Sequence, residues 1–249
     1  NYQDSKKIYL KFDSKNLIYA WYAKKRLAWI KSKIENNESA IIFLNKSFIE
    51  LENPTVINYY DLANFYKDFE KYNESIKYYT KVLKEVSKEH PLYPEILYRR
   101  GMSYERLKLW KKSDDDLIHS LNLAPEEPYV LNYLAYSWLE RNININKSIE
   151  MLEKAISKKK KDPYIIDSLG WGMYLIGRYN EAEIFLQRAV ELMPRDPIVN
   201  DHYGDILWKL NQNLQANYFW NYVLNLENTE DQMKDKIKKK LIFGIPDNS

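Results

Sequence analysis

The stretch DPYIIDSLGWGMYLIGRYNEAEIFLQRAVELMPRDP, residues 162–197, begins and ends with the same Asp-Pro pair, and the two pairs stand 34 residues apart. Aspartate is a favoured N-cap, and proline suits the first position of a helix. Each pair therefore predicts the start of a structural unit. The same boundary is expected at Glu127-Pro128 and at Tyr93-Pro94, although neither Glu nor Tyr is a strong cap.

Three columns of small residues keep the same period along the chain. Successive members of the first column are separated by 35, 38, 34, 35 and 34 residues, and the other two columns stay in step with it. The columns are Ala28, Ala63, Gly101, Ala135, Gly170 and Gly204; Ala40, Ser75, Ser113, Ser148, Ala182 and Ala216; and Ser47, Val82, Ser120, Ala155, Ala189 and Val223. Two antiparallel helices approach closely only where side chains are small, so we expect small residues of the two helices to face each other.

This period matches the tetratricopeptide repeat, a helix-turn-helix unit of about 34 residues. The predicted fold is all-α, a right-handed superhelical α-solenoid of about six such units. Their expected bounds are 21–55, 56–93, 94–127, 128–162, 163–196 and 197–230, after an N-terminal segment 1–20. In the second unit VSKEHPLY is expected to extend either the second helix or the loop after it by about one turn. Met233, Ile237 and Leu241 form one apolar stripe, which predicts a capping helix and tail over 231–249.

Composition supports a folded chain without indicating an activity. Hydrophobic residues make up 45% of the 249 positions, and a net charge of +3 is too balanced to indicate a nucleic-acid or anionic-membrane partner. The absence of cysteine excludes thiol chemistry, and no apolar run is long enough to span a membrane. The chain starts at Asn1, which leaves open whether upstream repeats, a signal peptide or a lipid anchor were removed.

Longer motifs resemble a group of bacterial repeat proteins best represented in alphaproteobacteria. The resemblance covers roughly residues 90–226. It is carried by HPLYPEILYRRGMSYERLKLW, VLNYLAYSWLERNININKSIEML, YIIDSLGWGMYLIGRYNEAEIFLQRAVELMPRDP and IVNDHYGDILWKLNQNLQANYFW. It implies a location in the periplasm or cell envelope, with the cytoplasm as the alternative, and no catalytic activity. One branch includes a lipoprotein adaptor of a carboxyl-terminal processing protease, so a protease or its substrate is an implied partner.

The first helix of each unit is expected to line a concave groove, and the resemblance places the exposed positions within it. These predicted groove residues are Lys25, Trp29, Tyr60, Asn64, Tyr98, Met102, Asn132, Tyr136, Asp167, Trp171, Asp201 and Asp205, bordered by Tyr129, Tyr164, Tyr174, Glu105 and Trp208. Aromatic rings between amides and acids suit a protein or peptide ligand, although any single ring is equally well explained by packing between helices. The carboxylate clamp of chaperone-binding repeats is incomplete, because Lys25 is followed by Trp29.

No catalytic, metal or cofactor site is predicted. The three histidines fall in different units without ligand spacing. Asp201, His202 and Asp205 form the tightest titratable cluster, for which a structural or ligand-contacting role outweighs an enzymatic one. The runs Asp114–Asp116, Lys158–Lys161 and Lys238–Lys240 are interpreted as solvated surface. The leading hypothesis is a non-enzymatic scaffold or adaptor, and the alternative is a self-assembling structural element acting through its ends or convex face.

Overall fold

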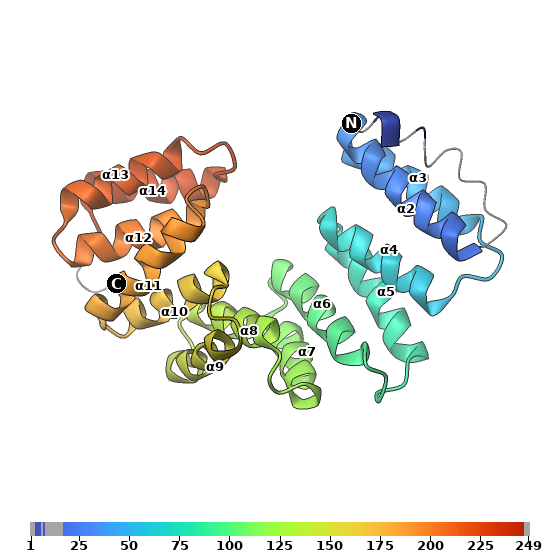
Figure 1. Cartoon of the computed structure of the whole chain (residues 1–249), viewed down its shortest axis with the longest axis horizontal. Helices are drawn as coiled ribbons and strands as arrows, with labels where there is room; N and C mark the ends of the chain where they lie inside the picture. The colour runs from blue at the N-terminus through green and yellow to red at the C-terminus, as the bar shows by residue number, and fades with distance from the viewer. Residues whose placement is uncertain (1–2, 6, 8–16, 247–249) are drawn as a thin grey trace. The chain divides into compact units, whose positions relative to one another are not determined.

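The computed structural model describes residues 3–5, 7 and 17–246, and within these residues it contains helices and no strand. The helices follow one another as antiparallel pairs (Figure 1). Their bounds are α2 (Leu17–Ile34), α3 (Asn37–Ile49), α4 (Val56–Asp68), α5 (Tyr72–Glu85), α6 (Tyr93–Arg106), α7 (Trp110–Leu123), α8 (Pro128–Glu140), α9 (Ile145–Lys158), α10 (Pro163–Leu175), α11 (Tyr179–Leu192), α12 (Pro197–Lys209), α13 (Asn213–Leu224) and α14 (Asp231–Phe243). The all-α prediction is confirmed.

The chain forms two compact units, Asn1–Leu123 and Ala124–Ser249, called unit 1 and unit 2 below. Unit 1 contains α2 to α7, and unit 2 contains α8 to α14. Each expected repeat interval holds one helix pair, although α2 begins earlier, at Leu17, and α6 begins at Tyr93. The extra residues of the second interval lie in the loop 86–92 and do not lengthen α5.

Aspartate caps fix the start of two first helices in unit 2. The Asp162 carboxylate accepts hydrogen bonds from the backbone N–H groups of Tyr164 (3.1 Å) and Ile165 (3.2 Å). Asp196 does the same one repeat later, with Ile198 (2.9 Å) and Val199 (3.1 Å). The two Asp-Pro predictions are confirmed. Before α8 and α6, Glu127 and Leu92 provide no side-chain cap.

The turn inside each of five helix pairs contains a residue in the left-handed region. These residues are Glu70 (φ 61°), Lys108 (φ 57°), Asn142 (φ 54°), Gly177 (φ 77°) and Asn211 (φ 61°). Only glycine adopts this conformation without strain, and asparagine tolerates it better than Glu or Lys. The turn geometry is therefore kept even where the residue type is unfavourable.

The small columns are buried, but the glycines of the first column do not face small residues as predicted. A Cβ atom on Gly170 would lie 2.7 Å from Cγ of Leu186, and one on Gly204 would lie 2.5 Å from Nε1 of Trp220. The glycines of the first helix thus accommodate large side chains of the second helix. A small residue of the second column instead meets the next pair, since the Ser75 and Ser103 hydroxyls lie 2.7 Å apart. For the glycines of the first column the prediction is wrong, because each faces a large side chain of the second helix.

The last helix, α14, packs its apolar stripe on the preceding pair. Ile237 is fully buried against Leu207, Trp220 and Val223, while Met233 and Leu241 pack beside it. The opposite face of α14 is exposed, with Gln232, Asp235, Lys236, Lys238 and Lys239 along it and the apolar Ile242 and Phe243 in its last turn. The predicted apolar stripe therefore has an observed partner surface.

Candidate functional site

Three of the six groove residues predicted in unit 1 meet at a pocket between α2 and α4. The pocket has a volume of ≈ 170 Å³ and includes Lys25, Trp29 and Asn64. Its other lining residues are Tyr22, Arg26, Asp61, Phe65 and Asp68. Tyr60, Tyr98 and Met102 are half-buried on α4 and α6 and do not line it.

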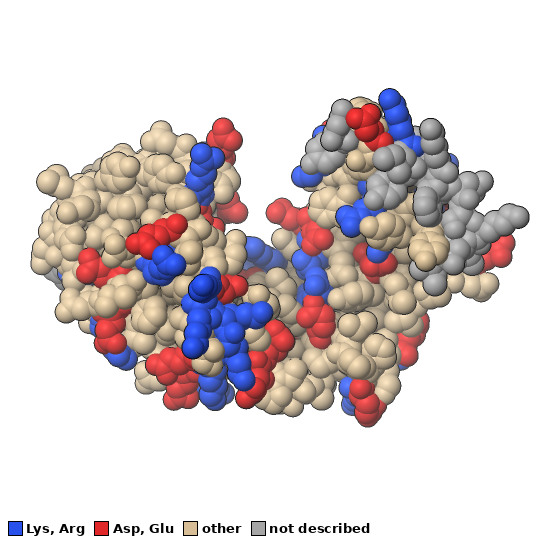
Figure 2. Space-filling model, in the orientation of Figure 1, with Lys and Arg blue, Asp and Glu red and all other residues tan. Residues whose placement is uncertain are grey.

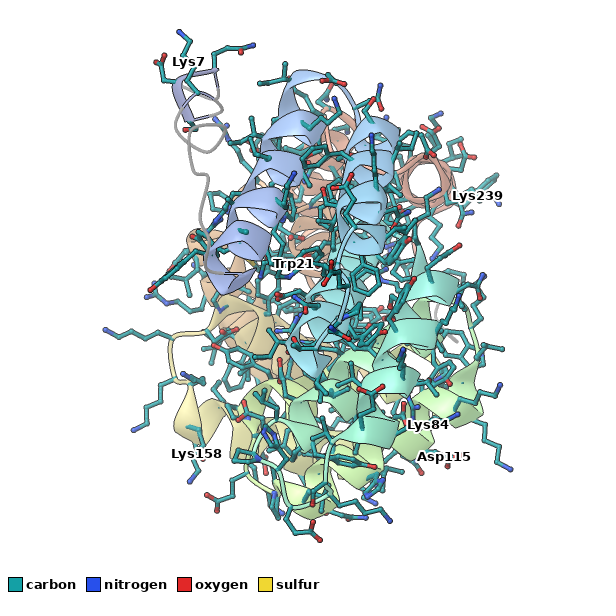
Figure 3. The ribbon with its side chains drawn as sticks, turned by 90° about the vertical axis from the view of Figure 1, so that its right-hand side faces the viewer. Lys7, Trp21, Lys84, Asp115, Lys158 and Lys239 are labelled. Carbon is teal, nitrogen blue, oxygen red and sulfur yellow. The ribbon has the colours of Figure 1, made fainter. Side chains whose placement is uncertain are left out.

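The carboxylate of Asp61, on α4, fixes one wall of this pocket through two side chains of α2. Asp61 accepts a hydrogen bond from the indole N–H of Trp21 (2.9 Å) and forms an ion pair with Nζ of Lys25 (2.7 Å). Trp21, which is labelled in Figure 3, is only 4% exposed. Because Asp61 is fixed from two sides, Lys25 is held at the pocket wall with its charge already paired.

The aromatic floor of the pocket is Trp29 with Phe65. The Trp29 ring is 37% exposed, and its centroid lies 6.3 Å from that of Phe65 and 5.2 Å from that of Phe69. These contacts hold the indole while leaving part of it open to a ligand. Such an exposed aromatic surface, framed by polar groups, is typical of binding sites in proteins.

Asn64 is oriented by a neighbour outside the pocket. Its Oδ1 accepts a 2.6 Å hydrogen bond from the hydroxyl of Tyr79, whose ring is tilted against Tyr60. Burial raises the pKa of Tyr60, and Arg99 partly opposes that shift. The Tyr79 hydroxyl thus fixes the orientation of Asn64 at the pocket wall.

In unit 2 the predicted groove residues form an internal network. Nδ1 of His202 lies 3.0 Å from both carboxylate oxygens of Asp167. The His202 ring stacks on Trp171 at 4.3 Å, and Trp171 stacks on Tyr174 at 4.7 Å. Burial lowers the pKa of His202, but the adjacent Asp167 carboxylate outweighs burial and raises that pKa to about 9. His202 is therefore an imidazolium at neutral pH.

A lysine from α14 neutralises the two acidic groups of α12. Nζ of Lys240 lies 2.6 Å from Oδ1 of Asp201 and 2.6 Å from Oδ1 of Asp205. Asp205 also accepts a 3.1 Å hydrogen bond from the indole of Trp220. Burial and the neighbouring Asp201 raise the pKa of Asp205 to about 6, against the opposing effect of Lys240. The prediction that Lys240 is solvated surface is wrong.

The expected exposure of the acidic groove residues is also wrong. Asp167 and Asp205 are each only 5% exposed, and the half-buried Asp201 is paired with Lys240. Their partners lie about one repeat further along the chain, because Asp167 and His202, like Asp205 and Lys240, are 35 residues apart. First helices of successive repeats are neighbours within unit 2, so side chains one period apart can meet. Testing charged pairs at this offset would have found both contacts from sequence.

Two other groove residues of unit 2 carry buried polar atoms without a partner. Within the described part of the chain, Oδ1 of Asn132 and Nε1 of Trp171 have no hydrogen bond. Tyr136 is half-buried, with its ring centroid 6.3 Å from that of His202. The packing interpretation of these rings fits Trp171 best, since His202 and Tyr174 stack on it.

The acidic run on α7 is likewise only partly solvated. Asp115, labelled in Figure 3, is exposed, but Asp116 is 7% exposed and holds Arg100 through two 2.7 Å hydrogen bonds. Among residues 3–5, 7 and 17–246, no three acidic or histidine side chains are arranged to hold a metal ion. No helix within that range is long and apolar enough to cross a membrane.

Comparison with known proteins identifies the repeat type. A family model described as "Tetratricopeptide repeat" matches residues 57–85, within α4 and α5. A TPR repeat-containing protein of Pseudomonas aeruginosa is 30% identical over 123 residues, which are 49% of this chain. The match spans only about a fifth (21%) of that relative.

Solved structures with 15–17% identity show the fold alone. A tetratricopeptide repeat protein from Parabacteroides merdae has a TM-score of 0.70, covering 95% of this chain and 90% of that one. The Cut9–Hcn1 hetero-tetramer of the APC/C has a TM-score of 0.76, covering 96% of this chain and 46% of that one. PilW, a type IV pilus biogenesis factor, has a TM-score of 0.63, with coverage of 77% and 88%. These likenesses confirm the predicted helical solenoid class.

Proposed function

We propose that this chain, which is a tetratricopeptide-repeat protein, binds another protein or peptide and that the pocket between α2 and α4 takes up part of that partner. Tetratricopeptide-repeat proteins are in general interaction scaffolds without catalytic activity. The observation that carries the proposal is Trp29, an exposed indole set in a concave site between polar walls.

The size and charge of the pocket limit what it accepts. A cavity of about 150 Å³ holds one benzene ring, so ≈ 170 Å³ suits a single large side chain. Lys25 and Arg26 on its walls are balanced by Asp61 and Asp68. The favoured ligand is therefore an uncharged aromatic or aliphatic side chain on a peptide whose backbone reaches Asn64 and the pocket rim.

Selection from a random peptide library on the full chain, followed by calorimetry, tests this assignment. A peptide recovered with the wild type should bind Trp29→Ala about thirtyfold more weakly, since truncating an aromatic hot spot costs about 2 kcal/mol. Tyr218→Ala is the matched control, because Tyr218 is a 66% exposed ring on α13 of unit 2. Equal affinity of the wild type and Trp29→Ala would exclude the pocket as the binding site.

The cellular setting is proposed from the resemblance to envelope repeat proteins. It supports an interaction in a bacterial envelope complex, with a processing protease or its substrate as the partner. Fractionation of the producing cells checks the location. Recovery only in the cytoplasmic fraction would contradict it and favour the alternative compartment.

A second candidate function is self-association through the convex face of unit 2. Ile184 on α11 and Leu214 and Tyr218 on α13 are 67%, 86% and 66% exposed. Their spacing in the repeat puts Ile184 and Tyr218 at equivalent positions of successive second helices. Light scattering distinguishes this function, because a monomer at every concentration would eliminate it.

A further inference from the structure

One edge of unit 2 displays a row of exposed apolar side chains. Tyr129, Tyr164 and Ile198 are the second residues of α8, α10 and α12, and they are 44%, 59% and 47% exposed. The three helices run in the same direction, since each begins a helix pair, and α10 packs against both others. Their first turns, and with them these three side chains, therefore lie along the same edge.

Cationic side chains stand beside this row. The loop before α10 carries Lys159, Lys160 and Lys161, and the loop before α12 carries Arg195, all exposed. Figure 2 shows a dense group of Lys and Arg where Figure 1 places α9 and α10. Lys158, at the end of α9, is labelled in Figure 3. Residues 157–163 also border an open hollow of ≈ 610 Å³.

The edge carries four acids, Glu126, Glu127, Asp162 and Asp196, against five cations, Lys158, Lys159, Lys160, Lys161 and Arg195. Glu126 is paired with Lys158 at 2.6 Å. Asp162 and Asp196 have their carboxylates directed at the positive N-terminal ends of α10 and α12. Glu127 is the remaining acid, against Lys159, Lys160, Lys161 and Arg195. In the described part of the chain neither Lys160 nor Lys161 forms an ion pair. The edge thus carries one more positive than negative charge, and the positive ends of α10 and α12 further offset the charge of Asp162 and Asp196.

We propose that this edge, the residues Tyr129, Lys159, Lys160, Lys161, Tyr164, Arg195 and Ile198, binds the anionic headgroups of a membrane surface. Lysine is attracted to anionic lipid, and tyrosine places an apolar ring and a polar hydroxyl at the depth of the headgroups. An acidic peptide would use only the positive charge of this edge. A membrane surface would contact both the lysines and the exposed tyrosine rings, and it is therefore the better fit. Nζ of Lys159 already lies 5.6 Å from the Tyr129 ring.

Co-sedimentation of the full chain with vesicles tests this proposal. The chain is expected to bind phosphatidylcholine vesicles that contain phosphatidylglycerol and not to bind vesicles of pure phosphatidylcholine. It should dissociate from the anionic vesicles as the salt concentration is raised. Each lysine near such a surface contributes about 1 kcal/mol, so the triple variant Lys159→Gln, Lys160→Gln and Lys161→Gln should lower the partition coefficient about a hundredfold. Replacing Tyr129 and Tyr164 by Ser should weaken binding while keeping its salt dependence.

The triple variant Lys236→Gln, Lys238→Gln and Lys239→Gln is the matched control, because it removes the same charge from the exposed face of α14. It should bind anionic vesicles like the wild type. Equal losses in both triple variants, or no vesicle binding by the wild type, would overturn the proposal. Binding of poly-glutamate without vesicle binding would also overturn it and indicate an acidic protein partner. Trp29→Ala, in unit 1, should leave vesicle binding unchanged, so this test is independent of the peptide pocket.

Discussion

The buried His202–Asp167 pair predicts that the protein loses stability as the pH rises above neutrality. The pKa of His202 is about 9 in the folded chain, against an ordinary value of 6.5. A group whose pKa is raised by folding stabilises the fold fully below its unfolded pKa, and that stabilisation is lost as pH rises through the folded pKa. The difference of about 2.5 pKa units corresponds to about 3 kcal/mol.

Urea unfolding followed by far-UV circular dichroism measures this effect. The free energy of unfolding of unit 2 should fall by about 3 kcal/mol between pH 6.5 and pH 9.5. His202→Gln should be less stable at pH 6.5, because it leaves the Asp167 carboxylate buried without its cation, and it should lack this pH dependence. His90→Gln, in an exposed loop of unit 1, is the matched control and should behave like the wild type.

A free energy of unfolding that stays constant between pH 6.5 and pH 9.5 would refute the assignment of a charged His202. The titration of Asp205 does not account for a loss of stability between pH 6.5 and pH 9.5. Its pKa is raised from 3.8 to about 6, so its contribution is lost as pH rises through that lower window. A histidine titration followed by NMR should also show one imidazole with a pKa of about 9, absent in His202→Gln.

Three other substitutions test the packing described above. Lys240→Met should cost about 3 kcal/mol of stability by leaving Asp201 and Asp205 unpaired, while Lys239→Met on the exposed face should change it little; equal effects in thermal melts would contradict the ion-pair assignment. Gly170→Ala should destabilise by about 1 to 3 kcal/mol because its Cβ would lie 2.7 Å from Leu186, and an unchanged urea midpoint would disprove the close approach. Lys108→Gly should stabilise by about 0.5 to 1 kcal/mol by relieving a positive φ, and a lower melting temperature would count against that turn geometry.

The fold could be predicted because its signals are local and repeated. Asp162 and Asp196 mark helix starts through bonds to backbone groups two and three residues away, and the apolar stripe of α14 is visible in one short segment. What the glycines face could not be read from the period. Whether Gly170 meets a small or a large side chain depends on how each of the two helices is rotated about its own axis. The repeat period does not determine that rotation.

The candidate site was harder to predict, because side-chain direction and partner choice decide it. Asp167 and Asp205 occupy positions expected to be exposed, yet His202 and Lys240 from the next helices bury them. The acids expected among the ligand-binding side chains of the groove are instead neutralised within unit 2. Reversing the charge of Asp167 or Asp201 should consequently disrupt the fold of unit 2, and unchanged circular dichroism in such a variant would restore the exposed interpretation.

Photo-crosslinking from the rim of the pocket tests the proposed binding role most directly. A benzophenone amino acid is placed at Tyr22, on the pocket wall, or at Tyr218, on the outer face of α13, and a selected peptide is added. A peptide seated on Trp29 should crosslink from position 22 and not from position 218. Crosslinks from position 218 alone would contradict binding at the pocket and would indicate that the peptide binds the convex face of unit 2.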